Sequence, residues 1–344
     1  MTENSLRFSD IPRLTHEELN AEYPVQNYLK IPLKLHQLQQ EIHRIESTRG
    51  ERDCLPALRR EVQNLEEELA KAPPDPVLPP PTPLIKVMGR LERFSKRRVM
   101  HYFDTEAFPS THRYLKRQRE RAESAALVVG AAGSAATAQG MLLEEGRIAN
   151  VAWYVTGRIN GRRFSGWLGR PYCRDGEEVE LIVAPVGEEY LVYAINKPQE
   201  RSLIMLPQCY RGVRQAKKLA TLYPLGVIFF IFTLITIVWI STHGFPGLKN
   251  QNFHKGILML VGIFTVIYFV PASWTIWRRY PFPKEELAEE IFTVLGWENV
   301  TDINLNKLNK RRRKQWLRTG KPENPFKDYT PFKCSGLGFG FYYY

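Results

Sequence analysis

The stretch LYPLGVIFFIFTLITIVWIS, Leu222–Ser241, runs for twenty residues without a charged side chain. Thr233, Thr236 and Ser241 are its only small polar residues. Twenty helical residues at about 1.5 Å each extend about 30 Å, the hydrocarbon thickness of a bilayer. A core helix of a soluble protein would carry polar residues on one face, so the stretch predicts a membrane span.

A second uncharged run, GILMLVGIFTVIYFVPASWTI, covers Gly256–Ile276. The fourteen residues between the two runs include Gly244, Pro246 and Gly247, which favour turns. Two spans joined by a short polar loop predict a transmembrane hairpin within residues 211–280, with spans at about 222–241 and 256–276.

Basic residues near the ends of the two runs predict their orientation, because Lys and Arg concentrate in cytoplasmic flanks. Seven basic residues flank the runs and two, Lys249 and Lys255, lie between them. The flanking residues expected to face lipid headgroups are Arg211, Arg214, Lys217, Lys218, Arg278 and Arg279. The sequence therefore predicts a multi-pass protein whose partner is the phospholipid bilayer.

Hydroxyl groups inside the runs suggest a pore-facing stripe. Thr233 and Thr236 are three residues apart, as are Thr265 and Tyr268. The alternative is that each threonine bonds the carbonyl four residues earlier in its own helix. Two helices cannot enclose water, so conduction would require a homo-oligomer.

The first 72 residues predict a helical hairpin, because apolar residues recur at alternating steps of three and four. These residues are Leu35, Leu38, Ile42 and Ile45, followed by Leu55, Leu58, Val62, Leu65 and Leu69. An antiparallel coiled coil and a pair of helices docked on another domain both fit the pattern. The run PPDPVLPPPTP, Pro73–Pro83, then predicts a stiff polyproline linker over 73–84.

Residues 85–149 are expected to form a basic helical region. Between positions 85 and 121 there are eleven Lys and Arg residues against four acidic residues. The uncharged run Ala125–Leu143 has small residues at four-residue steps, which fits either a membrane helix or a tightly packed soluble helix. Whether residues 125–143 span the membrane stays open.

Residues 150–210 change to a period of two and predict a small SH3- or OB-like β-barrel. Asn160-Gly161 is a strong hairpin signal, since a type I′ turn needs two residues with positive φ. Beyond the spans, Pro283–Gly296 predicts an amphipathic helix within a basic, partly irregular C-terminal region, 281–344. The expected fold class is thus an α+β membrane protein with a helical hairpin, a barrel and a transmembrane hairpin.

No recognised catalytic or phosphate-binding motif is present, so we expect no enzymatic activity and no catalytic residues. The cysteines, Cys54, Cys173, Cys209 and Cys334, are far apart, and the seven histidines are scattered. We therefore expect no metal site and no cofactor. The net charge of +12 fits anionic lipid, and no binding module surrounds the basic run Asn306–Trp316, so nucleic acid is not expected as a partner.

Several blocks of the chain resemble a family of type VI secretion system effectors of Gram-negative bacteria. They are GRRFSGWLGRPYCRDGEEVELIV (Gly161–Val183), the apolar pair of runs, EEIFTVLGW (Glu289–Trp297) and the ending GLGFGFYYY. The resemblance covers about residues 120–344.

The resemblance implies an antibacterial, pore-forming toxin that inserts into the cytoplasmic membrane of a target cell and permeabilises or depolarises it. It further implies an immunity protein and a secretion chaperone or spike protein as partners, and a location in the bacterial inner membrane. On the residues alone, the alternative is a resident inner-membrane scaffold or accessory protein with cytoplasmic interaction domains.

Overall fold

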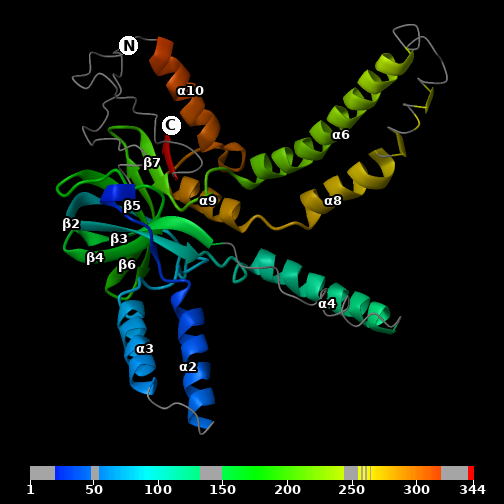
Figure 1. Cartoon of the computed structure of the whole chain (residues 1–344). Coiled ribbons are helices and arrows are strands. Elements are labelled where there is room, and N and C mark those ends of the chain that lie inside the picture. Colours follow the sequence, from blue (N-terminus) through cyan, green and yellow to red (C-terminus); the bar gives the residue numbers. More distant parts are fainter. Residues whose placement is uncertain are drawn as a thin grey trace, which may run out of the picture.

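An eight-stranded sheet lies at the centre of the structure (Figure 1). The structure is a computed structural model that describes residues 20–47, 54–131, 149–243, 265–318 and 340–344, together with 255, 256, 259, 262 and 263. The strands are β1 (Gln26–Asn27), β2 (Ile85–Tyr102), β3 (Ala149–Ile159), β4 (Arg162–Leu168), β5 (Glu178–Val186), β6 (Glu189–Lys197), β7 (Ser202–Met205) and β8 (Phe341–Tyr343). Their order is β1-β2-β3-β4-β6-β7-β8, and β5 pairs with both β2 and β6.

Strand β2 joins two parts of the sheet. Its first half pairs antiparallel with β5, from Ile85 opposite Val183, and its second half pairs with β3, up to Tyr102 opposite Ala149. The pairing with β3 is irregular between Glu92 and Ser95, where Arg93 has a φ of 53°. An extra residue at such a bulge bends a strand and changes which face its side chains meet.

Both faces of the sheet are buried in apolar clusters. Leu91, Phe164 and Ile195 belong to one cluster, and Val99, Trp167 and Ile182 belong to the other. Helix α9 (Pro283–Val294) packs against the second cluster through Leu287, Ile291 and Phe292. Burial of both faces explains why β5 reads as an almost continuous apolar run rather than an alternating one.

Helices α2 (Ile31–Ser47) and α3 (Leu55–Leu69) form a pair that projects from the sheet (Figure 1). Their apolar stripes are the least exposed parts of both helices, and Lys34 and Glu61 form an ion pair of 2.6 Å between them. The coiled coil itself stays a prediction.

The proline-rich segment is not a free spacer but lies against the sheet. The indole N–H of Trp167 donates to the carbonyl of Pro74 at 3.0 Å, and the hydroxyl of Tyr193 donates to that of Val77 at 2.7 Å. Thr82 also donates to the carbonyl of Pro185 at 3.0 Å. Prolines offer no N–H, so the first two contacts use backbone carbonyls of the segment, whereas the third uses the hydroxyl of Thr82 as donor.

Strand β8 closes the edge beside β7, where Tyr343 lies opposite Ser202. Phe341 and Tyr343 enter one apolar cluster and Tyr342 enters the other, and all three are fully buried. Helix α10 (Leu305–Arg318) supports the strand, because the side-chain oxygen of Asn309 accepts a hydrogen bond from the backbone N–H of Tyr343 at 3.1 Å.

The expected fold class is wrong. The structure is a mixed α/β fold with one eight-stranded sheet, in place of a small barrel confined to 150–210, because β1, β2 and β8 join from outside those residues. Residues 85–102, expected in a basic helical region, form β2. The two-helix transmembrane hairpin is also not found: within the described residues, one helix is long and apolar enough to cross a membrane.

Local expectations from the sequence fare better. Asn160 and Gly161 have φ values of 50° and 77° and connect β3 to β4, which confirms the predicted turn. Helix α9 begins at Pro283, as the amphipathic pattern predicts. The run 125–143 lies mostly outside the described residues, and its first part continues helix α4 (Pro109–Ala131).

Candidate functional site

An apolar arm extends away from the sheet (Figure 1). It consists of α6 (Val213–His243), the π-helical turn η2 (Thr265–Phe269) and α8 (Val270–Arg278), and α8 lies beside α6. The part of α6 from Val213 to Val238 is long and apolar enough to cross a membrane by length and composition. Its most apolar window has a mean hydropathy of 2.3, and none of that window is buried.

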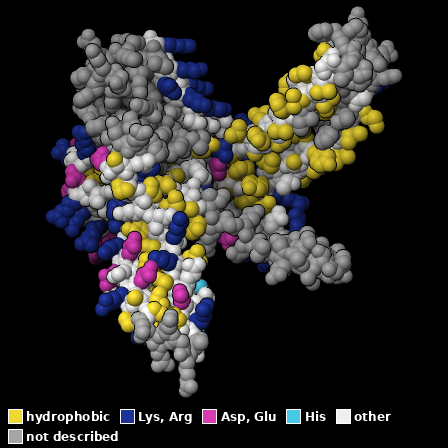
Figure 2. All heavy atoms as spheres, in the orientation of Figure 1, with side chains coloured by type: hydrophobic (Ala, Val, Ile, Leu, Met, Phe, Trp, Pro, Cys, Tyr) yellow, Lys and Arg dark blue, Asp and Glu magenta, His cyan; other side chains and the backbone are white. Residues whose placement is uncertain are grey.

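Large apolar side chains are exposed all along this arm (Figure 2). Phe229 is 75% exposed and Val266 is 68% exposed. Others are Leu222, Tyr223, Phe230, Ile237, Val238, Ile267, Tyr268, Val270, Trp274 and Trp277. Soluble monomers rarely expose contiguous apolar patches of this extent, so the surface calls for an apolar environment.

Pro271 explains the shape of the second half of the arm. Proline has no N–H to donate and its ring clashes with the carbonyl four residues earlier. Pro271 is the second residue of α8, and the π-helical turn η2 lies directly before this helix. A wider π-helical turn accommodates the lost hydrogen bond. In the second apolar run, residues 265–269 are therefore π-helical and residues from 270 are α-helical, and residues 257, 258, 260, 261 and 264 lie outside the described part.

The four residues expected to face a pore lie on α6 and η2, and their pore-facing role stays a prediction. The hydroxyls of Thr233 and Thr236 donate to the carbonyls of Phe229 and Phe232, each at 2.9 Å. This is the back-bonding alternative that the sequence left open. Thr265 and Tyr268 both belong to the π-helical turn η2, and the side chain of Tyr268 is exposed.

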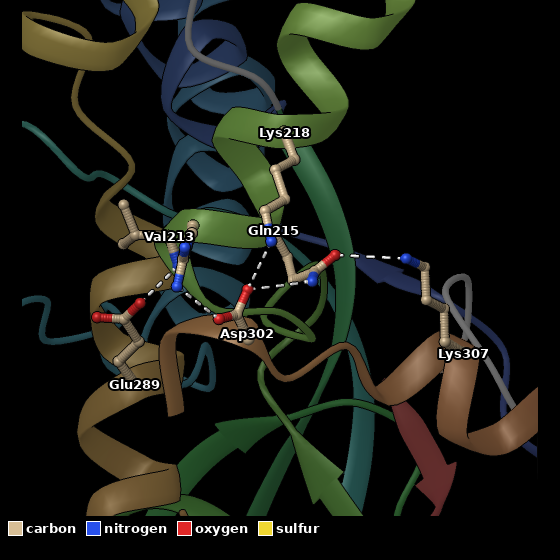
Figure 3. Close-up of polar contacts among 7 residues, drawn as sticks. Val213, Gln215, Lys218, Glu289, Asp302 and Lys307 are labelled. Carbon is tan, nitrogen blue, oxygen red and sulfur yellow. Dashed lines mark hydrogen bonds and ion pairs between the residues drawn. The ribbon is translucent and has the colours of Figure 1, made fainter. Parts of the chain in front are cut away.

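The first turn of α6 is tied firmly to the rest of the protein (Figure 3). The backbone N–H of Val213 donates to Glu289 of α9 at 2.6 Å. Asp302, in the short helix η3 (Val300–Asp302), forms ion pairs with Arg214 at 3.0 Å and Lys218 at 2.9 Å. These bonds satisfy donors at the start of the helix and set the direction in which the arm leaves the sheet.

Neighbouring contacts strengthen the same junction. Gln215 donates to Asp302 and accepts from Lys307 of α10, both at 3.4 Å (Figure 3). Arg211 pairs with the largely buried Glu285 of α9 at 3.0 Å. Gly212 permits the close approach, because a Cβ there would lie 2.4 Å from the carbonyl oxygen of Val300.

The electrostatics of the junction differ between its two carboxylates. The hydrogen bond from Lys218, with Arg214 beside it, lowers the pKa of Asp302. Burial raises the pKa of Glu289 above its ordinary value, although the hydrogen bond from Val213 partly offsets this. Asp302 is therefore a stable anion, whereas Glu289 is a carboxylate that bears a desolvation cost.

The six basic residues expected at the headgroups divide into two groups. Arg211, Arg214 and Lys218 pair with carboxylates and hold the arm to the domain. Lys217, Arg278 and Arg279 lie closer to α8: Lys217 donates to the carbonyl of Trp277 at 3.0 Å, and the guanidinium of Arg278 lies 4.0 Å from the ring centre of Trp274. No local pattern pointed to Glu285, Glu289 and Asp302 as their counterparts, because each of these carboxylates lies far along the chain from the residue that it contacts.

A second polar cluster lies inside the sheet region. The ammonium group of Lys197 forms ion pairs with Glu177 and, at 2.6 Å, with Glu200, and donates to the carbonyl of Tyr172 at 3.0 Å. Burial raises the pKa of the adjacent Cys173 thiol to about 12. A thiol that keeps its proton at neutral pH is a poor nucleophile. We therefore interpret the cluster around Lys197 as a structural part of the core and not as a reactive site.

Neither a family model, nor a curated protein, nor a solved structure matches this chain. The resemblance to type VI secretion system effectors accordingly stays a prediction. The functional argument rests on the apolar arm and its junction with the sheet domain.

Proposed function

We propose that the protein attaches to a membrane by inserting its apolar arm into lipid, while the α/β part stays at the membrane surface. The observation that carries the proposal is the apolar window of α6, none of which is buried. Transfer of apolar surface out of water is favourable by about 25 cal/mol per Å². Exposed Trp274 and Trp277, with Arg278 beside them, are residues typical of a membrane interface.

The junction supports attachment with a fixed geometry. Hydrogen bonds and ion pairs from Glu289 and Asp302 hold the first turn of α6. A rigid joint keeps the domain at a set angle to the arm, which suits a protein that presents its sheet to partners beside the membrane. We place this membrane as the bacterial inner membrane on the strength of the family resemblance.

Two activities are compatible with attachment. A resident scaffold or accessory protein is favoured by the hydroxyls of Thr233 and Thr236, because each already donates its hydrogen to a carbonyl of its own helix and so has no donor left for water. The second candidate is the effector that permeabilises a target membrane, with an immunity protein and a secretion chaperone or spike protein as partners. That candidate has the support of the resemblance.

The test of attachment is flotation of the purified chain with phosphatidylcholine vesicles on a density gradient. The variant F229Q/F230Q/V238Q replaces three exposed apolar residues of α6. We expect the wild type to float and the variant to stay at the bottom. The control L33Q/M88Q replaces exposed apolar residues outside the arm and should float. A wild-type chain that remains at the bottom contradicts the proposal.

Vesicles loaded with a self-quenching dye separate the two activities. Bound protein with dye retained is the result expected of a scaffold. Rapid dye release at the same bound amount, lost in F229Q/F230Q/V238Q, is the result expected of a permeabilising effector.

A further inference from the structure

A basic cavity lies where the apolar arm meets the domain. It has a volume of about 240 Å³ and is lined by α4, the first turn of α6, the end of α8 and the start of α9. The charged residues on its wall are Arg113, Arg117, Lys217, Arg278, Arg279 and Glu286. Four elements from distant parts of the sequence thus bring five cations and one carboxylate together.

The charge of the cavity is left largely uncompensated. Glu286 is its one carboxylate, and that group accepts a hydrogen bond from Ser110 at 3.0 Å. Within the described residues, no carboxylate pairs with Arg117 or Arg279. Five cations on the wall of one cavity favour an anion that they can share.

Aromatic rings give the cavity a firm wall. Tyr114 of α4 and Tyr280 lie with ring centres 5.4 Å apart, and Tyr280 lies 5.3 Å from the largely buried Phe282. Tyr280 follows directly after α8, so this wall fixes the cavity at the base of the arm. The site therefore adjoins the surface that we propose enters lipid.

We propose that this cavity binds the phosphate-bearing headgroup of an anionic phospholipid. Arginine presents a planar fork of N–H donors that matches phosphate oxygens, and Arg117 from α4 and Arg279, directly after α8, both line the site. This inference rests on the proposed function, because the cavity meets a headgroup only when the arm lies in lipid.

The position of the cavity favours lipid over free phosphate. Exposed Trp274 and Trp277 of α8 come just before Arg278 and Arg279, so acyl chains would lie along the arm while the phosphate enters the cavity. A site for free phosphate would need no apolar surface beside it. The lipid is thereby recognised by the cavity, which binds its phosphate, and by the adjoining apolar arm, which contacts its acyl chains.

The first experiment compares flotation with vesicles of phosphatidylcholine alone and of phosphatidylcholine mixed with phosphatidylglycerol. We expect the wild type to bind the mixed vesicles more tightly. Basic residues near an anionic surface contribute about 1 kcal/mol each, so R117Q/R279Q should bind mixed vesicles about thirtyfold more weakly. The control R119Q/K310Q removes the same charge from exposed positions outside the cavity wall and should change binding less than about threefold.

A second experiment keeps the proposal testable when vesicles do not bind. Calorimetric titration of the detergent-solubilised chain uses dihexanoyl phosphatidylglycerol, below its micelle concentration, and inorganic phosphate in parallel. Tighter binding of the short-chain lipid that R117Q/R279Q loses supports the headgroup site. Equal binding of inorganic phosphate, or unchanged lipid binding by R117Q/R279Q, overturns it.

The two proposals fail in different ways. No flotation with either vesicle contradicts attachment, and the titration then still reports on the cavity. Flotation with equal affinity for both vesicles leaves attachment standing and overturns the headgroup site.

Discussion

Lys197 carries a positive charge in the interior of the protein. Its side chain is 3% exposed, and its partners Glu177 and Glu200 are 24% and 7% exposed. Burial alone would lower its pKa, but Cys173 and the two carboxylates together raise it. The charge therefore persists, and removal of the ammonium group would leave two desolvated carboxylates side by side.

We expect K197M to lower the free energy of unfolding by about 3–5 kcal/mol, the cost of breaking a buried ion pair from one side. Urea denaturation followed by tryptophan fluorescence measures the change. K86M is the matched control, because Lys86 is 37% exposed and lies 3.7 Å from Glu180, so its loss should cost less than about 1 kcal/mol. Similar losses in both variants would show that burial does not matter here.

Glu289 should give the junction a pH dependence. Its pKa is raised in the folded protein, mainly by burial, so the folded state holds this proton more tightly than the unfolded state. The stabilisation from this group is complete below the ordinary pKa of 4.5 and is lost as the pH rises through the raised value.

In E289Q the amide oxygen can still accept the hydrogen bond from Val213, and no charge is desolvated. The unfolding free energy of E289Q relative to wild type should therefore rise as the pH increases from below about 4.5 toward neutrality. Urea midpoints over a pH series test this. Parallel pH profiles for the two proteins would mean that the carboxylate is well solvated.

At the scale of elements, the junction between α6 and η3 depends on Gly212. A Cβ at this position would lie 2.4 Å from the carbonyl oxygen of Val300 and 2.6 Å from backbone atoms of Thr301. Backbone cannot move aside as a flexible side chain can. The direction of the arm is therefore linked to the absence of one methyl group.

G212A should lower the free energy of unfolding by about 1–3 kcal/mol, as overpacking does elsewhere. G226A is the control in the same helix, since a Cβ at Gly226 meets nothing within 4 Å. Alanine there should stabilise by up to about 1 kcal/mol because of its higher helix propensity. Thermal unfolding of both variants measures the difference, and equal melting temperatures would refute the close contact.

Strand β2 shows why an element can be missed in the sequence. Leu91 enters one apolar cluster and Val99 enters the other, although both positions are odd. The bulge between Glu92 and Ser95 reverses the alternation halfway along the strand. Six basic residues in the same strand further mask the period of two and suggested a basic helical region: Lys86, Arg90, Arg93, Lys96, Arg97 and Arg98.

At the scale of the whole molecule, the limits of prediction follow from the range of the interactions. The turn at Asn160-Gly161 depends on two adjacent residues, and the α9 pattern on one helical face, so both could be predicted. The sheet depends on pairs such as Ile85 with Val183 and Ser202 with Tyr343, which no local pattern encodes.

One part of the candidate site could be predicted from a single segment of sequence, and the other part could not. The apolar character of α6 is a property of one segment and is visible in the sequence. The cavity at its base needs Arg117 from α4 beside Arg279 after α8, so it becomes visible only in the folded chain. The apolar run 256–276 was predicted as one long helix from its uncharged composition, whereas its described part from residue 265 is divided between the π-helical turn η2 and the short helix α8.

The pairing of β7 with β8 has a consequence for biosynthesis. The ribosome releases β7, then the whole apolar arm, and only later the residues of β8 that complete the sheet. During that interval the nascent chain exposes the apolar helix α6 and the unpaired edge of β7, and both features promote aggregation. Timely encounter of α6 with lipid or a chaperone during translation would determine the yield of folded protein.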